Sequence, residues 1–185
     1  MPETHRPHAS ATTKGFSLRL RSERTAASTS ERHFDPKGRD RDGLMVDVYR
    51  SSTRLWTGVF AFGETGFDFV SIIPGSTHIV VSSHGQGYVV DAEHPDIWQI
   101  IPSAFLNGAV IAPEASCVAV HDDWTVYSIC GSGNIARHQL NADGIHDVRA
   151  SGNVLSGTYE DAWAGGTQRS FRIELRRSQP FSRLE

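Results

Sequence analysis

Short apolar segments alternate with turn residues along most of this chain. Between Val110 and Leu175 the segments are rich in Val, Ile, Thr, Tyr, Phe and Trp, and the breaks between them hold Gly, Asn and Asp. The first group of residues favours strands, and the second tolerates the positive φ of tight turns. The pattern predicts an all-β fold of sequential antiparallel hairpins, arranged as a sandwich or as an abbreviated propeller-like array.

The same pattern continues upstream as far as residue 44. The hairpin with the clearest signal joins His78–Ser83 to Gly87–Ala92 through the short connection at His84. Three further strands are expected before this hairpin, at Leu44–Tyr49, Leu55–Phe62 and Phe67–Ile73.

Glu93–Phe105 is the one segment that reads as a short helix. Pro95 suits the first turn of a helix, and Ile97, Trp98 and Ile101 fall on one side of it. Pro102 stops the pattern, so the sequence predicts one or two helical turns.

Charge separates the start of the chain from the remainder. Residues 1–43 hold nine Lys or Arg against six Asp or Glu, a net of +3, whereas residues 44–185 hold nine against fifteen, a net of −6. We therefore expect a polar, mostly disordered tail over 1–43, a single all-β domain over 44–178 and a C-terminal tail over 179–185. Within the first tail, the alternation at Phe16–Leu20 fits one edge strand, and an over-extended start is the alternative explanation of this segment.

An internal repeat is visible in the middle of the chain. Placing 73–90 over 112–129 matches Pro74 with Pro113, His84 with Asp123 and Tyr88 with Tyr127. A strand repeat of about 40 residues is typical of propeller blades, although two hairpins with similar loops would align in the same way. At most four such units fit in 185 residues, so a propeller of six or more blades would require oligomerisation.

The second half of the chain carries a pattern that resembles a known group. The run DDWTVYSICGSGNIARHQLNADGIHDVRASGNVLSGTYEDAW, followed by SFRIEL, is similar to the C-terminal half of uncharacterised bacterial β-rich proteins with WD40-like strand and turn repeats. The resemblance covers roughly residues 55–175 and implies no activity. The His-Gly opening and Trp-Asp close of true WD40 repeats are missing.

No motif of catalysis, cofactor binding or metal binding is present. The histidines lack the spacing of recognised metal sites, and the serines lack a nucleophile elbow. His121, Asp122 and Asp123 are interpreted as a turn between strands, because Asp side chains accept hydrogen bonds from nearby backbone N–H groups. Cys117 and Cys130 flank this hairpin and lie nearly opposite; we expect both to be reduced, with a disulfide as the alternative. No catalytic residue, cofactor or metal is predicted.

Composition also bears on location and partners. The longest apolar runs are far shorter than the roughly 20 residues needed to cross a bilayer, and the start lacks the apolar core of a secretory signal. We therefore predict a cytoplasmic protein. The acidic body argues against nucleic-acid binding, which needs clustered Lys and Arg.

The function expected from these observations is non-enzymatic protein binding. An acidic single-domain protein suits a basic partner, as in an immunity-type protein that neutralises a basic toxin. The predicted binding residues lie in two turns, although a core position for Trp163 is favoured because large aromatic side chains are mostly buried; they are Asp122, Asp123, Glu160, Asp161 and Trp163. The alternative is a small-molecule or glycan binder, or a hydrolase, with a composite pocket of His84, His121, Asp123 and Trp163.

Overall fold

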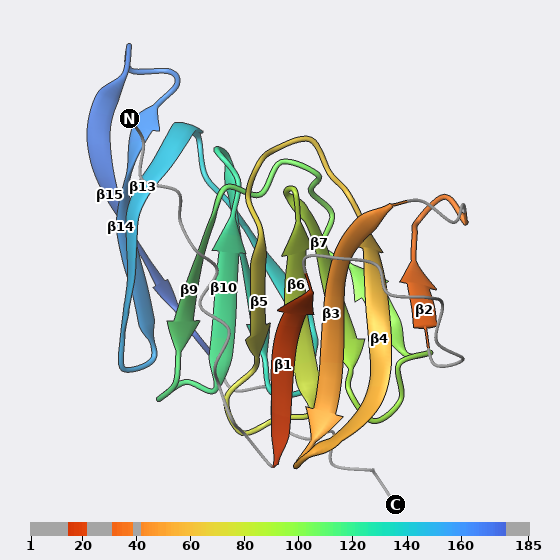
Figure 1. Ribbon diagram of the computed structural model, residues 1–185. Coiled ribbons are helices and arrows are strands. Elements are labelled where there is room, and N and C mark those ends of the chain that lie inside the picture. Colours follow the sequence, from red (N-terminus) through yellow and green to blue (C-terminus); the bar gives the residue numbers. More distant parts are fainter. Residues whose placement is uncertain (1–14, 22–30, 39–41, 177–185) are drawn as a thin grey trace, which may run out of the picture. The chain divides into compact units, whose positions relative to one another are not determined.

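The computed structural model describes residues 15–21, 31–38 and 42–176 (Figure 1). Over these ranges the chain forms strands joined by turns and bends, so the predicted all-β fold is confirmed. The described part contains no helix of the length and apolar character needed to span a bilayer. The chain divides into two compact units, which differs from the single domain expected over 44–178: unit 1 is Met1–Ile72 with Thr77–Asn107, and unit 2 is Ile73–Ser76 with Gly108–Glu185.

The first sheet of unit 1 includes part of the segment expected to be a tail. Its strands, in the spatial order β1-β3-β4-β2, are β1 (Phe16–Arg21), β3 (Gly43–Arg50), β4 (Thr53–Ala61) and β2 (Glu31–Phe34). The edge strand expected at Phe16–Leu20 is therefore present, and β2, which no pattern predicts, pairs parallel to β4. The expected tail is therefore corrected at β2, whereas β1 agrees with the expected edge strand. Residues 1–14, 22–30 and 39–41 lie outside the described residues, as does the tail expected over 179–185.

The second sheet of unit 1 is an antiparallel meander that confirms the predicted hairpin. It runs through β5 (Phe69–Ile72), β6 (His78–Ser83), β7 (Gln86–Asp91) and β8 (Trp98–Ile100). Aromatic rings fill the core of the unit: Phe34 stacks on Phe60 at 4.5 Å between centroids, and Phe60 lies 5.3 Å from Tyr88. The hydroxyl of Tyr88 donates to the carbonyl oxygen of Ala61 at 2.8 Å, which satisfies this buried polar group.

The helix predicted over Glu93–Phe105 is wrong. The segment holds β8, which pairs antiparallel with β7 and places the half-buried Trp98 against the aromatic core. Before it, a carboxylate oxygen of Asp91 accepts the backbone N–H of Glu93 at 2.8 Å and forms a turn where the helix is expected to begin. Sheet pairing and burial of Trp98 thus outweigh the local helical pattern.

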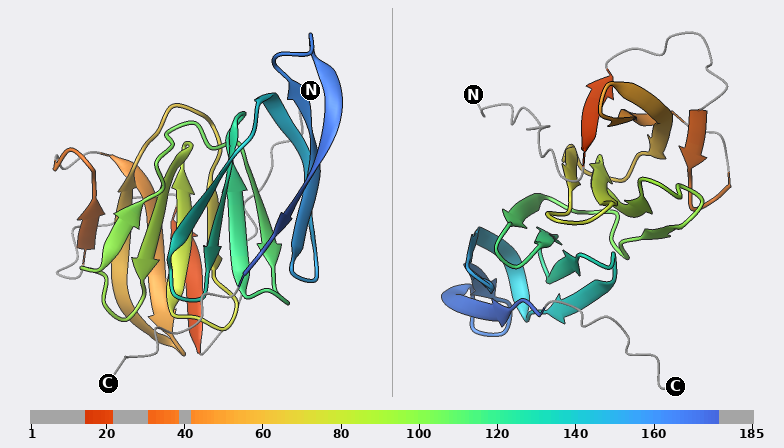
Figure 2. Two further views of the ribbon diagram at one scale, coloured as in Figure 1. Left: turned by 180° about the vertical axis from the view of Figure 1, so that it is seen from behind. Right: turned by 90° about the horizontal axis from the view of Figure 1, so that it is seen from below.

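Unit 2 contains a four-stranded sheet and a three-stranded sheet. The first, in the order β12-β11-β10-β9, comprises β9 (Gly108–Ala112), β10 (Cys117–His121), β11 (Thr125–Cys130) and β12 (Ile135–Gln139). The second is the long twisted ribbon of β13 (Ala142–Ser151), β14 (Val154–Asp161) and β15 (Thr167–Glu174) (Figure 2). The core of the unit gathers small and aliphatic side chains around Leu155 and Phe171.

The internal repeat is present in the strand positions. Strands β9, β10 and β11 follow β5, β6 and β7 respectively at one constant offset, the same offset that separates Pro113 from Pro74. Both sets continue into a fourth strand and form four-stranded antiparallel meanders, the strand order of a propeller blade. The repeat predicted from a few identities therefore corresponds to two sheets of equal topology.

Cys117 and Cys130 form a disulfide, which corrects the expectation of two reduced thiols. The pairing of β10 with β11 places these residues directly opposite each other. Strand register therefore brings the two sulfur atoms within bonding reach, an arrangement that the hairpin itself produces.

Candidate binding surface at two hairpin tips

Two hairpin tips of unit 2 share an Asp-x-Trp arrangement. At the β10–β11 tip, Oδ1 of Asp122 accepts the backbone N–H of Trp124 at 2.9 Å. At the β14–β15 tip, one repeat offset further along the chain, Oδ1 of Asp161 accepts the backbone N–H of Trp163, also at 2.9 Å. Each carboxylate also accepts the next N–H along the chain, at 2.7 and 3.2 Å, so both turns are fixed by side-chain caps.

The two capping carboxylates are turned inward, which changes the role expected for them. Asp122 and Asp161 are only 4% and 8% exposed. Oδ2 of Asp161 also forms an ion pair with Nε of Arg169, at 2.7 Å. The interpretation of Asp122 as a turn residue is confirmed, and both side chains shape the tips from within instead of facing a partner.

The two tryptophans are turned outward, which corrects the core position favoured for Trp163. Its side chain is 86% exposed and that of Trp124 is 45% exposed. The whole 162–166 connection extends into solvent beyond the sheet, so no apolar surface covers the ring. Trp124 is not among the predicted binding residues; the second occurrence of Asp-x-Trp at the repeat spacing is the sequence signal that identifies it.

The segment 141–144 contacts both tips through backbone hydrogen bonds. The N–H of Gly144 donates to the carbonyl oxygen of Asp123 at 3.1 Å, and the N–H of Ala162 donates to that of Asn141 at 3.2 Å. The tips accordingly lie at the same end of the unit 2 strands in Figure 1 and in the left view of Figure 2. We call this end the tip surface; it comprises Asp123, Trp124, Asp143, Glu160 and Trp163.

Acidic side chains accompany the tryptophans on the tip surface. Glu160 and Asp143 are exposed and Asp123 is half-buried. Arg169, which lies in β15 near this tip, is already paired with Asp161. The tip surface thus combines large aromatic area with negative charge.

His121 lies at the base of the β10–β11 tip and is held in its neutral form. Burial lowers its pKa, and the nearby His146 acts in the same direction, whereas the hydrogen bond to the Asp122 backbone and the adjacent carboxylates oppose the change. Its Nδ1 lies 3.2 Å from the carbonyl oxygen of Asp122. The imidazole therefore supports the turn and is uncharged at neutral pH.

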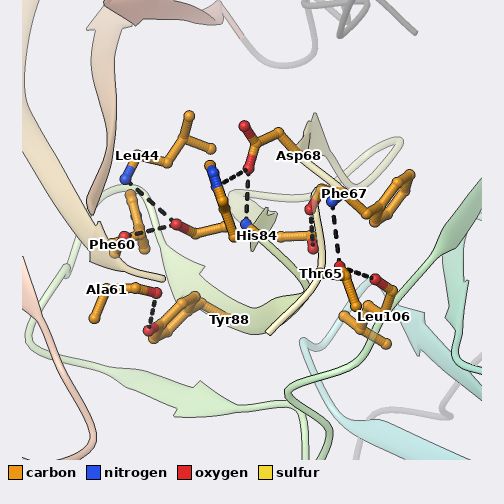
Figure 3. A network of polar contacts seen from close by, with 11 residues as sticks. Leu44, Phe60, Ala61, Thr65, Phe67, Asp68, His84, Tyr88 and Leu106 are labelled. Carbon is orange, nitrogen blue, oxygen red and sulfur yellow. Dashed lines mark hydrogen bonds and ion pairs between the residues drawn. The ribbon is translucent and has the colours of Figure 1, made fainter. Parts of the chain in front are cut away.

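His84 occupies the β6–β7 turn of unit 1 in a contact network of its own (Figure 3). Oδ1 of Asp68 accepts the backbone N–H of His84 at 2.7 Å and lies 3.1 Å from its Nδ1. The ring of Phe62 packs on the imidazole at 4.2 Å between centroids. Since His84 has a positive φ of 46°, these contacts hold a turn conformation that a non-glycine residue rarely adopts.

The residues expected in a composite pocket are divided between the units: His84 belongs to unit 1, and His121, Asp123 and Trp163 belong to unit 2. The structure contains a pocket of about 280 Å³ in unit 2 and one of about 440 Å³ in unit 1, and none of these four residues lines either of them. Among the described residues, no three His, Cys, Asp or Glu side chains gather closely enough to hold a metal ion.

Comparisons with known proteins identify no family for this chain. No family model and no curated protein matches it. A solved structure from S. cerevisiae, of Dbp5 bound to Nup159, Gle1, IP6 and ADP, is similar over 92% of this chain with 10% sequence identity and a TM-score of 0.40. The match spans about half of that chain, 54% of its length, and a likeness at this level carries no argument about function.

Proposed function

We propose that the chain is a non-enzymatic module that binds a partner protein through the tip surface. The observation that carries the proposal is the exposure of Trp124 and Trp163 on turns that Asp122 and Asp161 hold rigid. Tryptophan is enriched among the residues that contribute most to protein interfaces. A side chain presented on a fixed turn also loses little conformational entropy on binding.

The partner that fits this surface is basic. Asp123, Asp143 and Glu160 provide negative charge beside the rings, and residues 44–185 carry a net charge of −6. Lys and Arg side chains can pair with the carboxylates and lie over tryptophan faces. The concrete form of the proposal is an immunity-type protein of a bacterium that neutralises a basic toxin, in keeping with the resemblance to bacterial WD40-like proteins.

The redox state of one cysteine pair bears on the compartment. The sequence predicts a cytoplasmic protein, whereas disulfides such as Cys117–Cys130 persist mainly in oxidising compartments. Alkylation of thiols in intact cells before lysis distinguishes the two: two labelled cysteines support the cytoplasm, and none supports an oxidising compartment.

The test of the proposal is affinity purification of the tagged chain from its native host at low and at high salt. We expect the wild type to retain one stoichiometric basic protein at low salt and to lose it at high salt. The double variant Trp124→Ala/Trp163→Ala should lose this protein at both. Ile97→Ala, which removes an exposed apolar side chain of unit 1, is the matched control and should retain it. A partner retained by the double variant, or no partner at all, would contradict the proposal.

A further inference from the structure

The pocket of about 280 Å³ in unit 2 lies between β11, β12 and the end of β15. Cys130, Ile135 and Ala136 give it an apolar wall. Its polar and charged lining consists of Ser128, Asn134, His138, Glu174 and Arg176. The volume lies near the lower limit for small-molecule sites, so a ligand would have to be small.

A neutral pair forms one side of this pocket. Oγ of Ser128 lies 3.0 Å from Nε2 of His138, across the β11–β12 ladder. Ser128 is buried, and burial lowers the pKa of His138, so the imidazole stays uncharged at neutral pH. These two groups satisfy each other and add no net charge to the pocket.

Two opposite charges line the other side. Glu174 and Arg176 stand two residues apart at the end of β15. Within the described residues, the side chains of Glu174 and Arg176 form no ion pair and no hydrogen bond. The side-chain amide of Asn134 likewise forms no hydrogen bond with a described residue. A cation and an anion without partners in the described part of the chain thus line the same pocket as the apolar wall.

We propose that this pocket binds a small zwitterion with an apolar body, the class to which free aliphatic amino acids belong. Arg176 takes the carboxylate as a charge-assisted pair, Glu174 takes the ammonium group, and the aliphatic part lies against Ile135 and Ala136. Such a ligand pairs both charges and covers the apolar wall at once, whereas a simple anion or cation leaves one charge unpaired. The site is separate from the tip surface and does not depend on the proposed function.

Acyl transfer by the Ser128–His138 pair is the competing chemistry, and the geometry argues against it. A nucleophilic serine requires a histidine that a third group orients, usually a carboxylate. In the part of the chain that the structure describes, His138 is hydrogen-bonded to Ser128 and to no carboxylate. The pair is therefore a structural element of the pocket.

Isothermal titration calorimetry of the full chain tests the site with three probes. L-leucine carries both charges, 4-methylpentanoate carries the carboxylate alone, and 3-methylbutylamine carries the ammonium alone. We expect leucine to bind at least about tenfold more tightly than either single-charge analogue, because each loses one charge-assisted pair. Arg176→Gln and Glu174→Gln should each weaken leucine binding by about tenfold.

The matched control is Arg172→Gln, which removes an exposed charge of the same strand that does not line the pocket. It should bind leucine as the wild type does, and circular dichroism should show all three variants folded. No leucine binding at about 20 mM would overturn the proposal, because a site weaker than this is not specific. Equal affinity for leucine and 4-methylpentanoate would also overturn it, since the ammonium group would then contribute nothing.

Discussion

At the scale of single residues, Gly63 is a position where the surrounding backbone leaves no room for a methyl group. Its backbone N–H donates to the carbonyl oxygen of Ser83 at 2.9 Å, and a Cβ there would overlap the backbone nitrogen of Gln86 and approach the carbonyl oxygen of Ala104 to 2.8 Å. Backbone atoms held by hydrogen bonds cannot move aside cheaply, so Gly63→Ala should lower the free energy of unfolding by about 1–3 kcal/mol. Urea denaturation measures this loss.

Gly66→Ala is the control for that variant, since a methyl group added at Gly66, in the same connection, would meet no atom within 4 Å. Its free energy of unfolding should change by less than about 0.5 kcal/mol. An equal loss in both variants would show that the connection, and not the crowding at Gly63, determines the effect.

His121 should make stability depend on pH. Its pKa in the folded protein is lowered by burial from the ordinary value of 6.5. Above pH 6.5 the imidazole is neutral in both states and its contribution is complete; as the pH falls from 6.5 through the lower folded pKa, the unfolded chain binds the proton first and stability is lost. His121→Gln should therefore reduce the drop in the free energy of unfolding between pH 7.5 and pH 5.

Chemical denaturation at the two pH values checks this prediction. His94→Gln is the control, because His94 is exposed, and it should leave the drop as in the wild type. A drop of unchanged size in the His121 variant would assign the pH dependence to other groups, such as His138, whose pKa burial also lowers.

The tip surface shows which residue roles the sequence can predict. The turn role of Asp122 is local, because its carboxylate bonds to N–H groups two and three residues along the chain. The exposure of Trp163 is not local: a tryptophan beside two strands is buried or exposed depending on whether another element covers it. Composition alone favours the core, and for Trp163 that prediction is wrong.

At the scale of elements, the Cys117–Cys130 bridge should stabilise the β10–β11 hairpin. The bond joins residues with a sequence separation of 13. By restricting the unfolded chain, a loop of this length should contribute about 2–4 kcal/mol. The double variant Cys117→Ala/Cys130→Ala should lose this amount in urea denaturation.

Two controls accompany that measurement. A reductant should leave the free energy of unfolding of the double variant unchanged. The same reductant should lower that of the wild type towards the value of the double variant. Denatured wild type without reductant should show no free thiol; two free thiols per chain would contradict the disulfide and restore the expectation of reduced cysteines.

Whether an element is predictable from the sequence depends on how close its partners lie along the chain. Hairpins are predictable for this reason, and the Glu93–Phe105 segment is not. In His78–Ser83 and its partner strand, the apolar residues and the connecting turn are close in sequence, so local pattern and final pairing agree. In the other segment, the spacing of Ile97 and Trp98 satisfies a helix, but pairing with β7 and packing on Phe34 are tertiary interactions. Short apolar segments are ambiguous until their partner is known.

At the scale of the whole molecule, the sequence indicates the internal repeat better than it indicates where the folded part begins. The repeat offset recurs in three consecutive strands of each sheet, because equal strand and turn lengths produce it directly. The extent of the folded part is only partly visible: alternation indicates β1, whereas β2 has four residues and pairs with a strand far along the chain. Composition identifies the residues of β2 as tail-like, whereas the pairing of β2 with β4 depends on contacts far along the chain.

This difference leads to a prediction about truncation. A chain that starts at residue 44 lacks β1 and β2, and with them Phe16 and Phe34, which are fully buried in the core of unit 1. Losing two buried phenylalanines should remove about 3–5 kcal/mol for each, comparable to the whole stability of a domain, and should open the edges of β3 and β4 to aggregation. We expect this chain to be insoluble or to lack a cooperative thermal transition. A chain that starts at residue 15 retains both strands and should melt within a few degrees of the full chain, so equal behaviour of the two truncations would return the boundary of the fold to residue 44.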